Sequence, residues 1–294
     1  MSKSIKSERS FSIILLAITA TLWSLGGLFI KLVSLNPLAI AGIRSGIASI
    51  ILLIFLKKPK FTWSKGQIGA ALAYVATVIL FVTANKMTTA ANAIFLQFTA
   101  PIYVAIFGNW LLKEQTSPFD WLIVITVLGG MSLFFLEDLD WNGVVGNLVG
   151  IASGISFSFF TIFMRMQKDE SPLESVFLGN IITAIICLPF IFRAGPGRGE
   201  WVYLILLGVV QLGIPYILYS KAIKNLTAID AILIPIIEPL LNPIWVLLLV
   251  GEKPGQWVII GGIIVLTSIT IRSVLPILSK KRTKKHVKKA PISR

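Results

Sequence analysis

The sequence predicts an all-α integral membrane protein whose ten transmembrane helices form two inverted repeats of five helices each. Three observations predict this fold class. Hydrophobic residues make up 55% of the 294-residue chain and charged residues only 14%, whereas about 25% of an average soluble protein is charged. Apolar runs long enough to cross a bilayer recur along the whole chain. The two halves of the chain also share residues at a constant spacing.

Ten apolar runs define the predicted spans, because a helix needs about 20 residues to cross the hydrocarbon core. In chain order they cover residues 11–32, 37–56, 66–85, 91–112, 119–136, 145–165, 175–192, 201–222, 229–250 and 256–275. The first run is longer than the apolar core of a signal peptide and nine others follow it, so we expect it to be retained. The chain then divides into a tail (1–10), a five-helix unit (11–136), a second five-helix unit (145–275) and a basic tail (276–294).

Lysine and arginine predict the orientation of these spans. With the N-terminus in the cytoplasm, 21 of the 27 basic residues fall in cytoplasmic segments and 5 in outer segments. This bias predicts a multi-pass protein of the plasma membrane, with a bacterial cell membrane expected, and both termini in the cytoplasm. The basic charge lies between apolar runs, which argues against nucleic acid as a partner. Eight basic residues over 280–294 are instead expected to contact anionic lipids.

Residue counts exclude several classes of chemistry. Cys187 is the one cysteine of the chain and His286 the one histidine, so we expect no internal disulfide, no metal site and no Ser-His-Asp enzyme. The sequence has no nucleotide-binding loop, and ATP is therefore not expected to drive the protein directly. We expect no cofactor.

Residues matched at an offset of 138 positions indicate an internal repeat. The pairs are Thr89 and Thr227, Asn92 and Asp230, Pro101 and Pro239, and Glu114 and Glu252. Because each half holds an odd number of spans, the second half enters the membrane upside down relative to the first. Inverted repeats of this kind recur among secondary transporters.

A further set of stretches points to a known family. The stretches are residues 84–93, Pro101 and Lys113-Glu114, their mates 222–231, Pro239 and Gly251-Glu252, and Leu22-Trp23-Ser24, Lys31 and Arg44 in the first two spans. Together they resemble the EamA-type branch of the drug/metabolite transporter superfamily, although Lys113 replaces the glycine that is usual before Glu114. The resemblance implies a secondary transporter that exports a small organic metabolite, amino acid-like or drug-like, by alternating access.

Glu238 is the sharpest candidate for a functional residue. It lies in the middle of the ninth predicted span, where a carboxylate is costly unless it faces a cavity or a partner. Burial disfavours the charged form, which suits a proton carrier. Two interpretations stay open: Glu238 binds a substrate ammonium or exchanges protons, or it is a protonated acid hydrogen-bonded to a neighbouring helix.

Other polar and aromatic residues within the spans are candidates for the same pathway. Gln97 lies too deep in its span to be a cap, and Gln211 and Tyr219 are eight residues apart, so they share roughly one helix face. Ordinary hydrogen bonds between helices explain such residues equally well. Trp23 lies inside the first span, where it stacks on a substrate or fills the core.

Arg44 stands between two glycines in the second span. We favour a structural role, in which it reaches the outer interface or braces a helix end. The alternative is that Arg44 clamps a carboxylate or a phosphate of the substrate.

Matched residues also suggest where helices are interrupted and where they end. Pro101 and Pro239 each remove one backbone hydrogen bond in the middle of a span, which marks either a transport site or a packing kink. Asn92 and Asp230 lie near the starts of their spans and are expected to cap them. Glu114 and Glu252 lie at span ends and are expected to be structural, capping the next helix or pairing with lysine.

Small residues at every fourth position, Gly146, Gly150, Gly154 and Ser158, form a ridge on the sixth span. The ridge is either a packing face within the chain or a dimer interface, and the sequence leaves the oligomeric state open.

Three rival functions remain beside export of a small metabolite. An antiporter for nucleotide sugars or phosphorylated metabolites would need more buried lysine and arginine than Arg44 alone. A membrane-embedded enzyme would need clustered carboxylates, histidine or a nucleophile–base pair at one depth, a pattern that the sequence lacks. A channel would lack saturable counterflow.

Overall fold

The computed structural model describes residues 2–136, 143–193, 195–241, 244 and 255–287, and the side chains from residue 7 to residue 274 within these ranges. All regular secondary structure in the described part of the chain is helical. The helices are α1 (Ser2–Trp23), α2 (Gly26–Leu32), α3 (Pro37–Leu56), α4 (Lys65–Met87), α5 (Ala90–Gln97), α6 (Ala100–Leu112), α7 (Pro118–Phe134), α8 (Val144–Met166), α9 (Pro172–Ile186), α10 (Leu188–Arg193), α11 (Glu200–Leu206), the π-helix η1 (Leu207–Gly213), α12 (Ile214–Ala222), the 3-10 helix η2 (Ile223–Asn225), α13 (Ala228–Leu233), the 3-10 helix η3 (Ile234–Ile236) and α15 (Gln256–Val287). Residues 237–241 are also helical.

Seven helical segments among the described residues are long and apolar enough to cross a membrane. They coincide with the first, second, third, fourth, sixth, eighth and tenth predicted spans. The shorter apolar helices α7 and α9 match the fifth and seventh, and the described part of the ninth ends at residue 241. The chain is therefore a multi-pass membrane protein, and the full count of ten spans stays a prediction.

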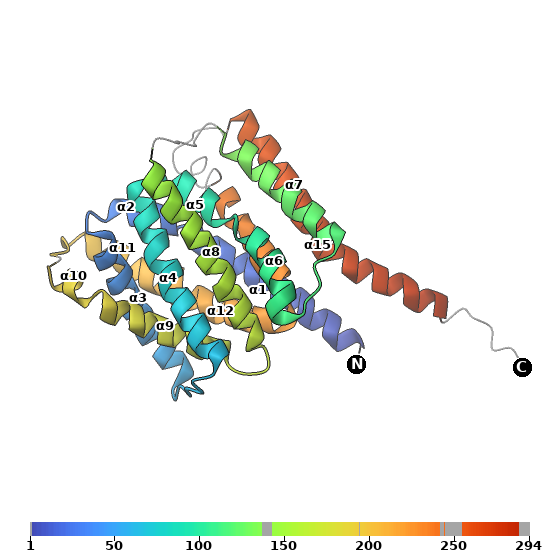
Figure 1. The fold of residues 1–294 in the computed structure, drawn as a ribbon, viewed down its shortest axis with the longest axis horizontal. Helices are drawn as coiled ribbons and strands as arrows, with labels where there is room; N and C mark the ends of the chain where they lie inside the picture. Colours follow the sequence, from blue (N-terminus) through green and yellow to red (C-terminus); the bar gives the residue numbers. More distant parts are fainter. Residues whose placement is uncertain (1, 137–142, 194, 242–243, 245–254, 288–294) are drawn as a thin grey trace, which may run out of the picture.

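Helix α8 lies at the centre of the bundle, packed along α4, α5 and α6 (Figure 1). On one side of this centre, α3 packs against α4, α9 and η1. On the other side, α7 and α15 run together as a pair (Figure 1). The start of α1 and the end of α15 lie on the same side of the bundle.

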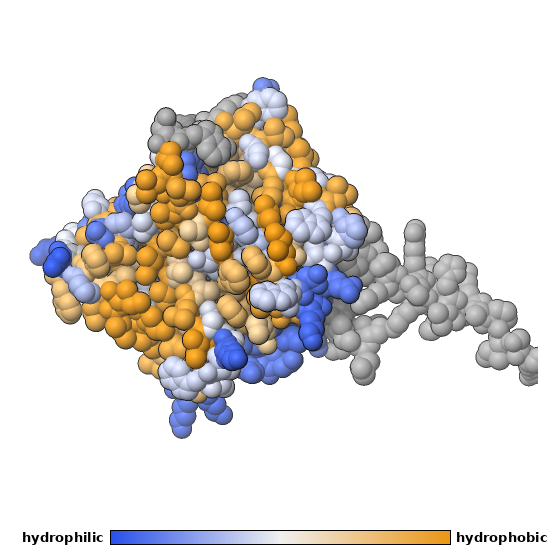
Figure 2. All heavy atoms as spheres, in the orientation of Figure 1, coloured by the Kyte–Doolittle hydropathy of each residue, from blue (hydrophilic) through white to orange (hydrophobic). Residues whose placement is uncertain are grey.

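The flank of the bundle carries an apolar surface (Figure 2). Large hydrophobic side chains such as Ile54, Leu122 and Phe192 are exposed on the molecule. On the face that Figure 2 shows, polar residues gather toward the edges of the apolar surface. A soluble protein avoids an exposed apolar surface of this extent. Contact with lipid is the arrangement that leaves these side chains in an apolar environment.

Hydroxyl side chains set the starts of several helices. Ser117 forms a capping box with Asp120 at the start of α7, because each side chain accepts a hydrogen bond from the other residue's backbone amide. Thr89 accepts from the amide of Asn92 at the start of α5, and Thr227 accepts from the amide of Asp230 at the start of α13. The two threonine caps are 138 positions apart, so the matched sequences fold the same way locally.

The small-residue ridge of α8 packs inside the chain. A Cβ atom added to Gly146 would meet the backbone of Met87 at 2.8 Å, and one added to Gly154 would lie 2.8 Å from the carbonyl oxygen of Gln97. The backbones of α4 and α5 therefore come as close to α8 as glycine allows. This face is covered by the protein's own helices and is not free for a dimer interface.

Lys113 ends α6 with a left-handed backbone conformation, at φ 56°. Glycine adopts this conformation without the steric cost that a Cβ atom brings. The position therefore has a physical reason to be glycine, as it usually is in the family that the sequence resembles, and lysine holds the same turn under local strain.

The contact between α7 and α15 predicts that two adjacent glycines differ sharply in how well they tolerate a larger side chain. A Cβ atom at Gly261 would overlap the carbonyl oxygen of Gly130 and lie 2.5 Å from the amide nitrogen of Phe134, whereas the nearest atom to a Cβ at Gly262 is 3.8 Å away. We expect Gly261→Ala to destabilise the protein by about 1–3 kcal/mol, because backbone must move. Gly262→Ala is the control and should change stability by less than about 0.5 kcal/mol. Melting temperatures of the purified variants in detergent measure both, and equal values would contradict the packing described.

Candidate functional site

Five of the predicted spans are interrupted in the described part of the chain. The seventh breaks at Cys187, between α9 and α10, and the other four interruptions lie close together in space. The first span breaks between α1 and α2, the fourth between α5 and α6, the eighth passes through η1, and the ninth passes through η3. The sequence pointed to an interruption in the fourth and ninth spans, through Pro101 and Pro239, and the structure adds those in the first and eighth. Trp23, Gln97, Gln211 and Glu238 lie at or next to the four interruptions.

Local chemistry explains these interruptions. Ser24 donates a side-chain hydrogen bond to the carbonyl oxygen of Thr21, and two glycines follow at the start of α2, so the first helix loses both regular bonding and propensity. Pro101 has no N–H for the preceding turn and stands in the first turn of α6. Pro235 lies within η3. In a membrane such irregular backbone is tolerated where it lines a cavity.

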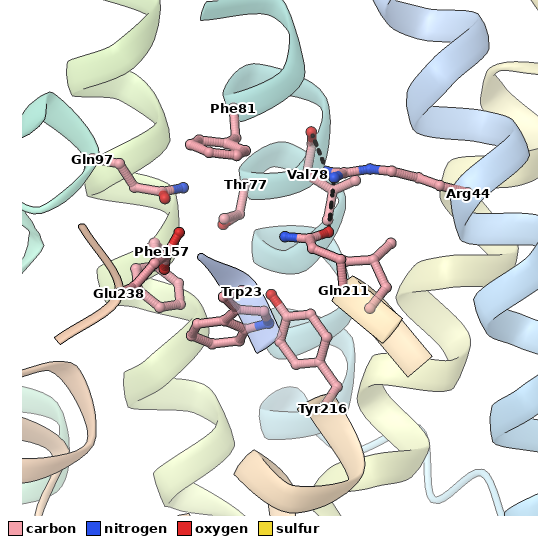
Figure 3. A pocket seen from close by; sticks show the side chains of 11 residues that line it. Trp23, Arg44, Thr77, Val78, Phe81, Gln97, Phe157, Gln211, Tyr216 and Glu238 are labelled. Carbon is pink, nitrogen blue, oxygen red and sulfur yellow. Dashed lines mark hydrogen bonds between the residues drawn. The ribbon is translucent and has the colours of Figure 1, made fainter. Parts of the chain in front are cut away.

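A cavity lies between the interrupted helices (Figure 3). Its lining combines aromatic, aliphatic, amide and charged side chains, namely Trp23, Arg44, Thr77, Val78, Phe81, Gln97, Phe157, Gln211, Leu212, Tyr216 and Glu238. This mixture of an apolar wall with a few polar groups is typical of a small-molecule site. We call this cavity the central pocket.

Glu238 and Gln97 form one side of the central pocket (Figure 3). The Glu238 side chain is 6% exposed, and among the described residues no hydrogen bond or ion pair is made to its carboxylate. Gln97 is anchored, since its Nε2 donates to Ser153 Oγ at 2.8 Å. The structure therefore gives no support to the interpretation of Glu238 as an acid hydrogen-bonded to a neighbouring helix.

Arg44 and Gln211 form the opposite side (Figure 3). Arg44 is only 1% exposed, so it does not reach the outer interface. Its Nη1 donates to Gln211 Oε1 at 3.0 Å, and its Nη2 donates to the carbonyl oxygen of Val78 at 3.4 Å. Both acceptors are neutral, and none of the salt bridges among the described residues involves Arg44.

Aromatic rings close the pocket on a third side. Trp23 packs against Tyr216 with ring centroids 5.2 Å apart, against Tyr219 at 5.6 Å and against Phe157 at 6.0 Å. Tyr219 is fully buried, and its hydroxyl shares a 3.0 Å hydrogen bond with Thr161. Trp23 is therefore both a pocket wall and a core aromatic.

The structure brings together five of the six predicted pathway residues and leaves out one. Trp23, Arg44, Gln97, Gln211 and Glu238 line the central pocket, whereas Tyr219 lies behind it. The prediction that Gln211 and Tyr219 share a face assumed a regular α-helix. The π-helix η1 adds a residue to the turn, so the pocket receives Tyr216 from α12 in place of Tyr219.

Pro101 and Pro239 do not line the pocket. Each stands in the first helical turn after an interruption, Pro101 in α6 and Pro239 in the helical residues 237–241. Their part is to end the preceding bonding pattern, and the pocket is lined by residues on either side of the breaks.

Residues expected at helix ends take part in polar contacts there. Asn92 donates from Nδ2 to Asn147 Oδ1 at 2.8 Å. Glu114 accepts from Arg165 Nε at 2.8 Å and from the amide of Ala228, the first residue of α13, at 2.9 Å. Glu114 thus stabilises the start of a helix in the second half of the chain. Glu252, which we expected to act in the same way, lies outside the described residues.

Asp230 is the centre of an ion-pair cluster rather than the cap of its own helix, since Thr227 fills the cap position. Arg9 Nη2 lies 3.1 Å from Asp230 Oδ2, Arg272 Nη1 lies 3.2 Å from Asp230 Oδ1, and Arg272 Nε lies 2.7 Å from Asp120 Oδ1. These four residues, the inner ion-pair cluster, connect α1, α7, α13 and α15.

Several residues of the central pocket have no signal in the sequence. Thr77, Val78 and Phe81 come from α4 and Phe157 from α8. Their spacing on α4 is that of one helix face, but apolar residues at this spacing line a core as often as a cavity. Within the described ranges, no group of three or more His, Cys, Asp or Glu residues could hold a metal ion.

Comparison with known protein families shows the family to which the chain belongs. The profile of the EamA-like transporter family matches residues 10–136 and again residues 144–274. The two matches cover nearly the whole chain. The protein belongs to the EamA-like transporter family. It is thereby also a transporter of the drug/metabolite superfamily, and a small-molecule substrate follows from the family.

Individual relatives of this transporter are distant but extend over most of the chain. An uncharacterized transporter of Archaeoglobus fulgidus is 25% identical over 257 residues, which are 87% of this chain and 94% of the relative. Human solute carrier family 35 member G1 is 24% identical over 85% of this chain and 75% of its own length. A solved crystal structure of a protein with 14% identity shares the fold, with a TM-score of 0.76 over 90% of this chain and 97% of that one.

The close approach of Gly26 to Gln211 leads to a testable prediction about the hydrogen bond between Gln211 and Arg44. A Cβ atom at Gly26 would lie 2.8 Å from Gln211 Nε2 and 3.1 Å from its Cδ. We expect Gly26→Ala to push the amide away from Arg44 and to lower stability by about 1–3 kcal/mol, because a buried charge loses a hydrogen bond. In a Gln211→Ala background the same change should cost less than about 0.5 kcal/mol, because the amide is already absent.

We would test this with a double-mutant cycle. It compares the melting temperatures in detergent of Gly26→Ala, Gln211→Ala and the double variant. Gly27→Ala is the control, since a Cβ there meets its nearest atom at 3.5 Å. Additive losses in the double variant would show that Gly26 does not act through Gln211.

Proposed function

We propose that the protein is a secondary active transporter that exports a small organic metabolite, amino acid-like or drug-like, across the plasma membrane in exchange for protons. The observation that carries this proposal is the central pocket. It lies where four helices are interrupted and holds a buried carboxylate that has no hydrogen-bond or ionic partner among the described residues. A carboxylate in such a place either binds a cation of the cargo or takes up a proton, and competition between the two couples their movements.

Two inverted five-helix repeats supply the two states of this mechanism. The two matches to one family profile, the threonine caps 138 positions apart and the paired interruptions before Pro101 and Pro239 support this arrangement. In such transporters the two halves exchange conformations, and the site opens to each side of the membrane in turn.

The described conformation favours closure on the side predicted to be cytoplasmic. From the central pocket, α12 runs through Tyr216 and Tyr219 toward the predicted cytoplasmic ends of the helices. At those ends the inner ion-pair cluster and the Arg165–Glu114 pair join elements of both halves. Loading from the cytoplasm requires these contacts to separate, and this is the step in which we expect the halves to rock apart.

The pocket weakens the rival functions. Arg44 is the one basic residue among its described lining residues, so a nucleotide sugar or a phosphorylated metabolite would lack cations for its phosphates. No histidine or cysteine is among these lining residues, and Glu238 is their one carboxylate, so an enzyme would lack a nucleophile–base pair. The transporter relatives favour carriage over catalysis.

Export is tested first by metabolite profiling of cells that express the wild-type protein or the Glu238→Gln variant. We expect a compound enriched in the medium with wild type and not with the variant, which retains the shape of the carboxylate but no charge. Glu170→Gln, at an exposed position, is the matched control and should behave as wild type. A compound that accumulates in the cells instead would reverse the proposed direction.

The compound so found is then tested in proteoliposomes. We expect saturable counterflow, as a carrier requires, and uptake that depends on an imposed proton gradient in wild type but not in Glu238→Gln. Unchanged pH dependence in the variant, which must still melt cooperatively in detergent, would remove Glu238 from the mechanism. Flux that never saturates would favour a channel.

A further inference from the structure

No carboxylate of the described residues forms an ion pair with Arg44. A guanidinium has five N–H donors, and the structure provides two neutral acceptors, Gln211 Oε1 and the carbonyl oxygen of Val78. The Nε atom is buried without a hydrogen-bond partner. A buried cation is costly unless it is paired and hydrogen-bonded, so a site with these features is incomplete without an anion.

The guanidinium of Arg44, which has no ionic partner among the described residues, lies at the central pocket. The other arginines with described contacts to a carboxylate, Arg9, Arg165 and Arg272, each form an ion pair, whereas Arg44 lies within α3 and lines the pocket. Glu238 is on the opposite side of the pocket and does not pair with it (Figure 3). The two buried charges therefore face the same cavity from different walls, with the rings of Trp23 and Tyr216 between them on a third wall.

We propose that Arg44 is an anion subsite for the carboxylate of the transported solute, so that the cargo is a bipolar organic molecule whose negative group binds Arg44 and whose positive group lies toward Glu238. The inference rests on the proposed function, because it takes the central pocket as the transport site. It departs from the structural role that the sequence favoured for Arg44. Gln211, in the turn of η1, then occupies one guanidinium donor that a bound carboxylate could use.

Charge and geometry select the class of anion. The planar guanidinium donates two parallel hydrogen bonds to a carboxylate. With both side chains ionised, Arg44 and Glu238 bring no net charge to the pocket, so a cargo without net charge leaves it neutral. A phosphate carries up to two charges, and the described lining residues include no second cation to meet them. The apolar rings favour a hydrocarbon or aromatic body between the two poles.

The test measures binding to the purified full-length protein by its melting temperature in detergent at constant ionic strength. Three probes share one skeleton: phenylalanine carries both charged groups, 3-phenylpropionate only the carboxylate, and 2-phenylethylamine only the amine. Acetate and propionate are included so that size does not limit access, and chloride and inorganic phosphate test an inorganic anion as the natural occupant.

We expect the carboxylate probes to raise the melting temperature of wild type, with phenylalanine or the short acids acting at the lowest concentrations. Arg44→Gln should weaken these probes by about tenfold or more, since a charge-assisted hydrogen bond is lost, and should leave the effect of 2-phenylethylamine unchanged. Arg193→Gln removes an exposed arginine and serves as the control for net charge.

A second variant keeps the test decisive if Arg44→Gln does not fold. Gln211→Ala frees one more donor of Arg44, so carboxylates should stabilise this variant by more degrees than they stabilise wild type. A purely structural Arg44 would lose stability in Gln211→Ala with no added response to carboxylates.

Three results would overturn the inference: no carboxylate probe stabilises wild type, the probes act equally on Arg44→Gln, or chloride alone reproduces the whole Arg44-dependent effect. These results are separable from a failure of the proposed function. Saturable, proton-dependent counterflow of a cargo without a carboxylate would leave the transporter proposal in place and remove only the anion subsite.

Discussion

The need to satisfy backbone hydrogen bonds away from water is the constraint on which the rest of this structure depends. In hydrocarbon an N–H or C=O group without a partner costs several kcal/mol, so a membrane-spanning chain is helical wherever lipid surrounds it. Interruptions survive where protein or a cavity supplies the missing partners. The breaks at Ser24, Phe98, η1 and η3 converge on one cavity, and this convergence marks the site more clearly than any single residue does.

Two ionisable side chains, Arg44 and Glu238, lie on opposite walls of the central pocket. Arg44 and Glu238 are both deeply buried and both lack an ionic partner among the described residues. Had they paired with each other, the site would be neutral, satisfied and closed to a charged cargo. Because they lie on opposite walls, the pocket can receive a solute that brings both charges, which is the cargo that we propose.

Residues matched between the two halves of the chain have the same caps but different side-chain partners. Thr89 and Thr227 cap their helices in the same way, but their partners diverge, because Asn92 meets Asn147 whereas Asp230 meets two arginines. Asp230 thereby joins α13 to α1 and α15 on the side predicted to be cytoplasmic, whereas Asn92 joins α5 to α8.

The sequence by itself determined that the chain is a multi-pass helical membrane protein, and it located α3 to the residue and most other helices to within a few residues. Apolar run length and capping residues are local properties, so they can be read without the fold. It also singled out Glu238, Arg44, Gln97, Gln211 and Trp23, because polar or bulky residues inside an apolar span are conspicuous.

Only the tertiary structure decided how these residues are arranged. The π-helix η1, which brings Tyr216 into the pocket in place of Tyr219, packs against α3. No local pattern in the sequence predicts this π-helix. The contacts of Arg44 with Gln211 and Val78 and the capping of α13 by Glu114 join segments far apart in the chain. Periodicity shows which side of a helix is polar, but the partner of that side is fixed by the packing of the whole bundle.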